Sequence, residues 1–188
     1  MNSILRFATF AAAITLGTFA ARAAEPGYFD LGKFTPAEGC QFVEVNLDLP
    51  LLKVASLFVG QEEPQAAELI RNLKRVHVNV VGFNDTNRAD TLARIGQIRD
   101  QLENAGWTRA VTVKQGASEG DADVAVFVKL NADSAIDGVV VTVIDSNEKQ
   151  AVFVNVVGSI RPEQLAALSK RFNLPGLDKV APAINKNA

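Results

Sequence analysis

The chain has 188 residues, of which 48% are hydrophobic and 21% charged, with a formal net charge of -2, one cysteine and one histidine. A length of this order suits one globular domain with a real core. The mildly acidic balance gives nucleic acid no electrostatic reason to bind, and the lone Cys40 excludes an internal disulfide.

The first 23 residues have the pattern of a secretory signal peptide. A short segment ending at Arg6 precedes an apolar run from Phe7 to Ala21, which is too short to span a bilayer comfortably. The small residues Ala21 and Ala23 around Arg22 predict cleavage after Ala23, with one residue later as the alternative. Removing two arginines and no acids leaves 17 basic and 21 acidic residues, a net charge of -4. We therefore expect an exported chain, periplasmic or secreted.

Residues 24–40 predict an irregular arm ahead of the folded domain. They mix turn-forming residues with Tyr28, Phe29, Leu31 and Phe34. Cys40 follows this arm instead of the apolar segment, so it lacks the position of a lipid-anchor cysteine. We expect it to be a small buried apolar side chain, with an intermolecular disulfide as the alternative. No later apolar run is long enough for a membrane span.

The first regular elements are a strand, two helices and a second strand. Alternation of apolar and polar residues predicts strands over 41–48 and 74–83. Between them, a helix is predicted from Pro50 to Gly60 and another from about Glu63 to Leu73. The residues that recur at helical spacing in the first helix are Leu51, Val54, Ala55 and Phe58.

The second half contains most of the strands. A helix is predicted from about residue 85 to Gly106, followed by strands over 107–114, 122–130, 138–145 and 150–157. Short, turn-rich linkers indicate that consecutive strands pair antiparallel. Gly158 is expected to close the last strand, and Pro162 to begin a final helix.

This order, β-α-α-β-α-β-β-β-β-α, indicates an α+β fold with a single mainly antiparallel sheet of about six strands and helices mostly on one face. The expected organisation is a signal peptide (1–23), the arm (24–40), one domain (41–180) and a frayed tail (181–188).

One face of the predicted sheet is the candidate interaction surface. If the valines of the strands point to the helices, alternation sends the other residues to the opposite face. The residues of that candidate surface are Phe127, Phe153, His77, Asn79 and Lys129. An apolar face of this size is either covered or marks an interaction site. We expect the arm to cover it, with a partner as the alternative.

The sequence assembles no catalytic constellation. The Gly-x-Ser-x-Gly match at 116–120 leads into a strand instead of a helix, and no histidine follows Ser118, so a hydrolase nucleophile is not expected. One histidine and one cysteine make no zinc site without carboxylates, and no phosphate-binding loop occurs. We expect no enzyme activity, cofactor or metal. The alternative is an enzyme that uses the sheet face around His77, with Asn79 and Arg109.

Four segments resemble the bacterial domain-of-unknown-function family numbered 4252: VEVNLDLPLLKVASLF, KRVHVNVVGF, AGWTRAVTVKQG and FVNVVGSIRPEQLAALSKRFNLPGLDKV. The likeness covers roughly residues 28–180 and implies an exported single domain, in a family where some members are lipid-anchored and none has an assigned activity. The family pattern has an acid where Arg161 stands, which puts the cap of the last helix in doubt. We expect a non-enzymatic periplasmic domain that binds an envelope protein or a small apolar ligand, or a self-associating structural module.

Overall fold

The computed structural model describes residues 25–59, 64–114, 122–133 and 135–161. The expected signal peptide with its cleavage site, the Gly-x-Ser-x-Gly loop and the final helix lie outside these residues. Within them the elements are β1 (Phe42–Asp48), α1 (Leu49–Val59), α2 (Pro64–Asn72), β2 (Leu73–Gly82), α3 (Arg88–Asn104), β3 (Thr108–Lys114), β4 (Ala122–Leu130), β5 (Ile136–Asp145) and β6 (Gln150–Ile160).

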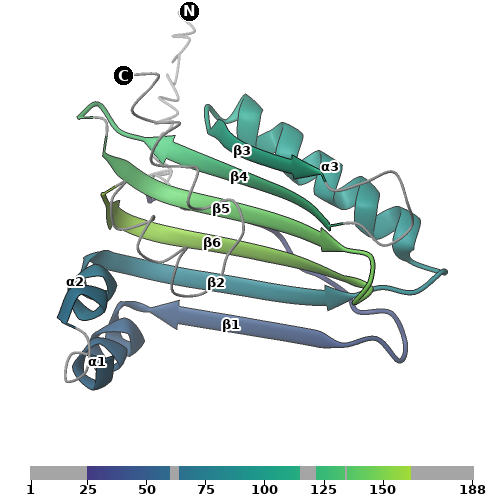
Figure 1. Ribbon diagram of the computed structural model, residues 1–188, viewed down its shortest axis with the longest axis horizontal. Helices are drawn as coiled ribbons and strands as arrows, with labels where there is room; N and C mark the ends of the chain where they lie inside the picture. Colours follow the sequence, from purple (N-terminus) through teal and green to yellow (C-terminus); the bar gives the residue numbers. More distant parts are fainter. Residues whose placement is uncertain (1–24, 60–63, 115–121, 134, 162–188) are drawn as a thin grey trace, which may run out of the picture.

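The six strands form one open antiparallel sheet in the order β1-β2-β6-β5-β4-β3 (Figure 1). Strands β3 to β6 pair consecutively, which confirms the predicted meander. Strand β6 then pairs with β2, and β2 with β1, so the two halves of the chain join between the second and third strands of the sheet. The α+β class and the single antiparallel sheet are therefore confirmed.

One side of the sheet, which we call the valine face, consists of three aligned rows. The middle row runs Val45, Val78, Val154, Val141, Val126 and Val111 across all six strands. A row on either side repeats the pattern, from Val43 to Val113 and from Leu47 to Thr108. Seventeen of these eighteen positions are apolar, as expected for β-branched residues on a pleated surface.

The opposite side, which we call the arm face, carries the aromatic and polar residues of the strands. Helices α1 and α2 pack at the valine face through Leu52 and Leu69. Helix α3 packs against the arm face instead, through Ile95, Ile98 and Leu102 (Figure 1). The longest of the described helices thus departs from the expected side, because its apolar stripe finds aromatic partners on the arm face.

Burial in the central strands corrects the expected roles of the two faces. The arm-face residues of β6, Ala151, Phe153, Asn155 and Val157, are all 0% exposed. The valines between them are only partly buried. At the centre of the sheet, the arm face is therefore the better covered side.

Strand β6 also continues through Gly158 to Ile160, although the glycine was expected to end it. Gly158 has φ +156°, and a Cβ there would lie 2.4 Å from the carbonyl oxygen of Asn72. The glycine permits the strand to pass closely under the junction between α2 and β2, next to a register shift in the pairing of β2 with β6.

Candidate functional site

The arm is fixed to the sheet by one buried amide. The Asn155 side chain, 0% exposed, accepts the N–H of Phe29 at 3.1 Å and donates to the carbonyl of Gly27 at 3.2 Å. Its Nδ2 also donates to the carbonyl of Val139 at 3.2 Å, so the amide joins the arm to β5 and β6. Beside it, Gly27 and Gly138 approach so closely that a Cβ on Gly138 would lie 2.2 Å from the Gly27 oxygen.

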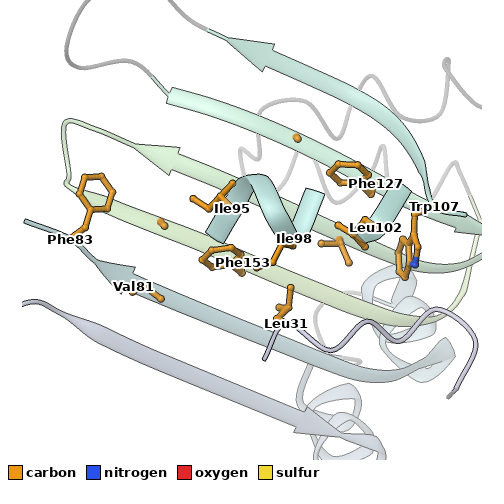
Figure 2. Packing of buried hydrophobic residues seen from close by; sticks show 12 residues of the cluster. Leu31, Val81, Phe83, Ile95, Ile98, Leu102, Trp107, Phe127 and Phe153 are labelled. Atoms are coloured by element: carbon orange, nitrogen blue, oxygen red, sulfur yellow. The ribbon is translucent and has the colours of Figure 1, made fainter. Parts of the chain in front are cut away.

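The aromatic residues of the arm cover the face that carries Phe127 and Phe153. Phe34 packs on Phe153 with ring centroids 4.5 Å apart, and Phe29 meets Trp107 edge to face at 6.2 Å. Leu31 of the arm belongs to the same buried cluster as residues of α3, among them Ile98 and Leu102 (Figure 2).

Phe127 and Phe153 are each 0% exposed. In the described structure these two members of the candidate surface are therefore not accessible to a partner. Of the two alternatives, the structure shows the arm as the cover, together with α3, because their apolar side chains supply the partners that these rings need.

His77 and Asn79 form a small polar cluster with Glu44 near the β1 edge of the arm face. The Nε2 atom of His77 lies 2.9 Å from Nδ2 of Asn79 and 3.4 Å from Oε1 of Glu44. When Nε2 carries no proton, it accepts a hydrogen bond from the Asn79 amide. When Nε2 carries a proton, it donates a hydrogen bond to Glu44. The His77 side chain is 15% exposed and that of Glu44 is 46% exposed, so the ring is more enclosed than expected, with its acid at the surface.

The structure does not bring the other predicted residues to this cluster. Lys129 lies on β4, separated from β2 by β5 and β6, and its Nζ donates to the carbonyls of Ala105 and Gly106 at the end of α3. Arg109 lies on the edge strand β3, roughly 19 Å from β2 at four strand spacings, and pairs with Glu103 at 2.9 Å. The constellation of His77, Asn79 and Arg109 is thus not assembled.

A second polar cluster, which the sequence patterns did not single out, lies between α3 and the sheet. Arg99 donates from Nε to Thr142 Oγ1 at 2.9 Å and from Nη1 to Asp123 Oδ2 at 3.1 Å. The three residues come from separate elements. Arg99 lies among the buried apolar residues of α3, but an arginine in the sequence carries no local signal that it is buried. The pair holds α3 on the sheet.

The accessible apolar residues lie elsewhere, on β1 and α1. Of the eight large hydrophobic residues that are exposed in the described part of the chain, seven are Val43, Val45, Leu49, Leu51, Val54, Leu57 and Phe58. Leu57 is 72% and Phe58 is 76% exposed, the highest values of the set. The helix buries Leu52 and Ser56 instead.

We call Leu51, Val54, Leu57 and Phe58 the α1 stripe. Leu51, Val54 and Phe58 occupy positions i, i+3 and i+7 of the helix. This spacing is the sequence signal of one apolar helix face. Such a stripe normally packs on a core, but in the described residues it faces outward. The repeat was predicted correctly, and only the structure shows which way it points.

The described residues contain no group of three or more histidine, cysteine, aspartate or glutamate side chains that could hold a metal ion. Among the described helices, none combines the length and apolar character needed to cross a membrane.

Comparison with known proteins gives one match. The model of a family described as "Domain of unknown function (DUF4252)" matches residues 37–168, a range that contains all the described strands and helices. No curated protein matches the chain. No solved structure matches it either.

Proposed function

We propose that this chain, which belongs to the DUF4252 family of domains of unknown function, is an exported, non-enzymatic domain that binds another protein of the cell envelope through the α1 stripe. The observation that carries the proposal is the gathering of exposed apolar side chains on α1. A helix that turns such a stripe away from its own core offers the groove-binding geometry by which amphipathic helices dock.

The energetics favour an occupied stripe. A fully buried leucine, valine or phenylalanine side chain gains roughly 1.5–3 kcal/mol relative to water, and the four stripe residues are between 51% and 76% exposed. Covering them would supply on the order of 5 kcal/mol of apolar driving force before the costs of association. In this proposal Leu57 and Phe58 are the anchors that a partner covers.

Export is supported by the N-terminal segment, whose charged start, apolar run and small-residue cleavage pattern are those of a secretory signal. The absence of a catalytic role is supported by the site geometry. His77 has Asn79 and Glu44 as polar neighbours, while Arg109 lies on the far edge of the sheet.

The proposal is tested by photo-crosslinking in intact cells. A photoreactive amino acid replaces Leu57, and a matched control replaces Gln101, an exposed residue on α3. We expect a defined crosslinked species from position 57 that is absent from position 101, and that Leu51→Asp in the same chain abolishes. Equal crosslinking from both positions, or none from position 57, would contradict the proposal.

A further inference from the structure

The two edges of the sheet differ in how they are protected. Strand β3 pairs with β4 through a register shift between Arg109 and Val111, and it carries the cations Arg109 and Lys114. Bulges and charged side chains of this kind prevent an edge strand from pairing with another chain. Strand β1 pairs with β2 over seven residues without a shift, and it contains no lysine, arginine or proline. The β1 edge therefore lacks the bulge and the cations of β3, and its only charged residues are Glu44 and Asp48.

The free backbone groups of β1 can be assigned from its pairing. The N–H of Gly82 donates to the carbonyl of Gln41 at 2.7 Å, so the backbone groups of Gln41 point toward β2. The direction of these groups alternates along a strand, so those of Val43, Val45 and Leu47 also point toward β2. The N–H and C=O groups of Phe42, Glu44 and Asn46 then point away from the sheet. Figure 1 shows β1 as the outermost strand, with α1 beyond its end and no described element alongside it.

We propose that β1 pairs antiparallel with β1 of a second copy of this chain, about a two-fold axis that passes through Val45. The two six-stranded sheets then continue into each other. Val45 lies opposite Val45 of the second copy, Val43 opposite Leu47, and Glu44 opposite Asn46. The outward backbone groups of Glu44 and Asn46 are the ones that exchange hydrogen bonds in this register.

Charge selects this register among the symmetric ones. An axis through Glu44 would place two glutamates directly opposite each other, and an axis through Asn46 would place Glu44 opposite Asp48 twice. Like charges at directly opposed positions are destabilising. An axis through Val45 pairs all seven residues of β1 and opposes each Glu44 to the amide of Asn46, a pair whose side chains already bond within one chain at 3.0 Å.

The same register continues the valine face. Val43 and Val45 are each 37% exposed at the margin of their sheet, and the pairing places apolar side chains of the second copy directly against them. Cross-strand contacts between aliphatic residues then run without interruption from one copy to the other. The apolar and the charged faces of β1 therefore favour the same alignment.

This inference goes beyond the proposed function, because it names a second copy of the chain as a partner and rests on the edge of β1 instead of on the α1 stripe. The test is sedimentation equilibrium of the full chain at low ionic strength, comparing wild type with Asn46→Lys and Asn46→Glu. Asn46 is exposed, so neither change disturbs the core. Thr112→Glu, an equally exposed position on β3, is the matched control.

We expect a concentration-dependent dimer. The cation introduced by Asn46→Lys faces Glu44 of the second copy, so this variant tightens the dimer. The anion introduced by Asn46→Glu faces the same carboxylate, so that variant weakens the dimer. Each shift in the dissociation constant is about two- to thirty-fold, because two symmetry-related charge pairs change together. Thr112→Glu leaves the dimer unchanged.

Three results would overturn the inference: a wild-type chain that stays monomeric at every concentration, a dimer that Asn46→Lys weakens, or a dimer that only substitutions in the α1 stripe dissociate. None of these results affects the crosslink expected from position 57, so the proposed function can survive the loss of this inference. A missing crosslink beside an intact β1 dimer would instead remove the proposed envelope partner alone.

Discussion

Asn155→Ala should release the arm from the sheet. The substitution removes three hydrogen bonds, which join Asn155 to Phe29, Gly27 and Val139. A typical buried hydrogen bond contributes roughly 0.5–1.5 kcal/mol net, so we expect the free energy of unfolding to fall by about 2–4 kcal/mol. For a domain of this size that corresponds to roughly 5–15 °C in the midpoint of thermal unfolding.

The readout must separate the arm from the rest of the domain. Hydrogen exchange at the Phe29 amide reports the arm directly, because this N–H donates to Asn155 in the folded chain. We expect its protection to be lost at temperatures where amides of β5 and β6 remain protected. Asn104→Ala, an exposed asparagine at the end of α3, is the control and should change stability by less than about 0.5 kcal/mol. Unchanged protection at Phe29 together with a loss below 0.5 kcal/mol would refute the reasoning.

Three further substitutions test separate contacts. Gly138→Ala should lower the thermal midpoint and expose the arm to protease, because its Cβ would lie 2.2 Å from the Gly27 oxygen; an unchanged digestion pattern would count against the close contact. His77→Ala should lower the free energy of unfolding by about 1–2 kcal/mol in chemical denaturation, because Asn79, 2% exposed, loses its side-chain partner. Wild-type stability together with a lost cellular phenotype would indicate instead that His77 belongs to a functional site. Lys129→Met should cost about 0.5–1 kcal/mol, because the carbonyls of Ala105 and Gly106, which directly follow α3, lose a cation. The loss should appear as faster hydrogen exchange in the last turn of α3, and no change there would show that water replaces the cation.

Most of the regular structure could be predicted because its signals are local. Strand β4 has the predicted bounds, and α3 ends before Gly106, whose φ of +74° suits the left-handed conformation expected after a helix. The pairing of β2 with β6 was not predictable, because it joins segments about 75 residues apart through hydrogen bonds that leave no local pattern. Alternation separates the two faces of a strand, but it does not say which face is the better covered.

The candidate site shows the same limit. The spacing of Leu51, Val54 and Phe58 predicts a helix correctly, yet the buried contacts of α1 are made by Leu52 and Ser56. Similarly, the aromatic residues of the arm were recognised as anchors, while their attachment depends on Asn155 and on a contact between Gly27 and Gly138, which lie far apart in the sequence. Such contacts follow from the assembled sheet, and a pattern within one segment cannot reveal them.

Carbene footprinting of the purified chain and of the chain in intact cells tests the central claim most directly, because it compares the α1 stripe with the arm face in one experiment. We predict strong labelling of Leu57 and Phe58 in the purified chain and protection of both in cells, with Phe127 and Phe153 unlabelled in either state. Labelling of Phe58 that is equal in both states would contradict an occupied stripe. Labelling of Phe153 in the purified chain would contradict an arm that covers it.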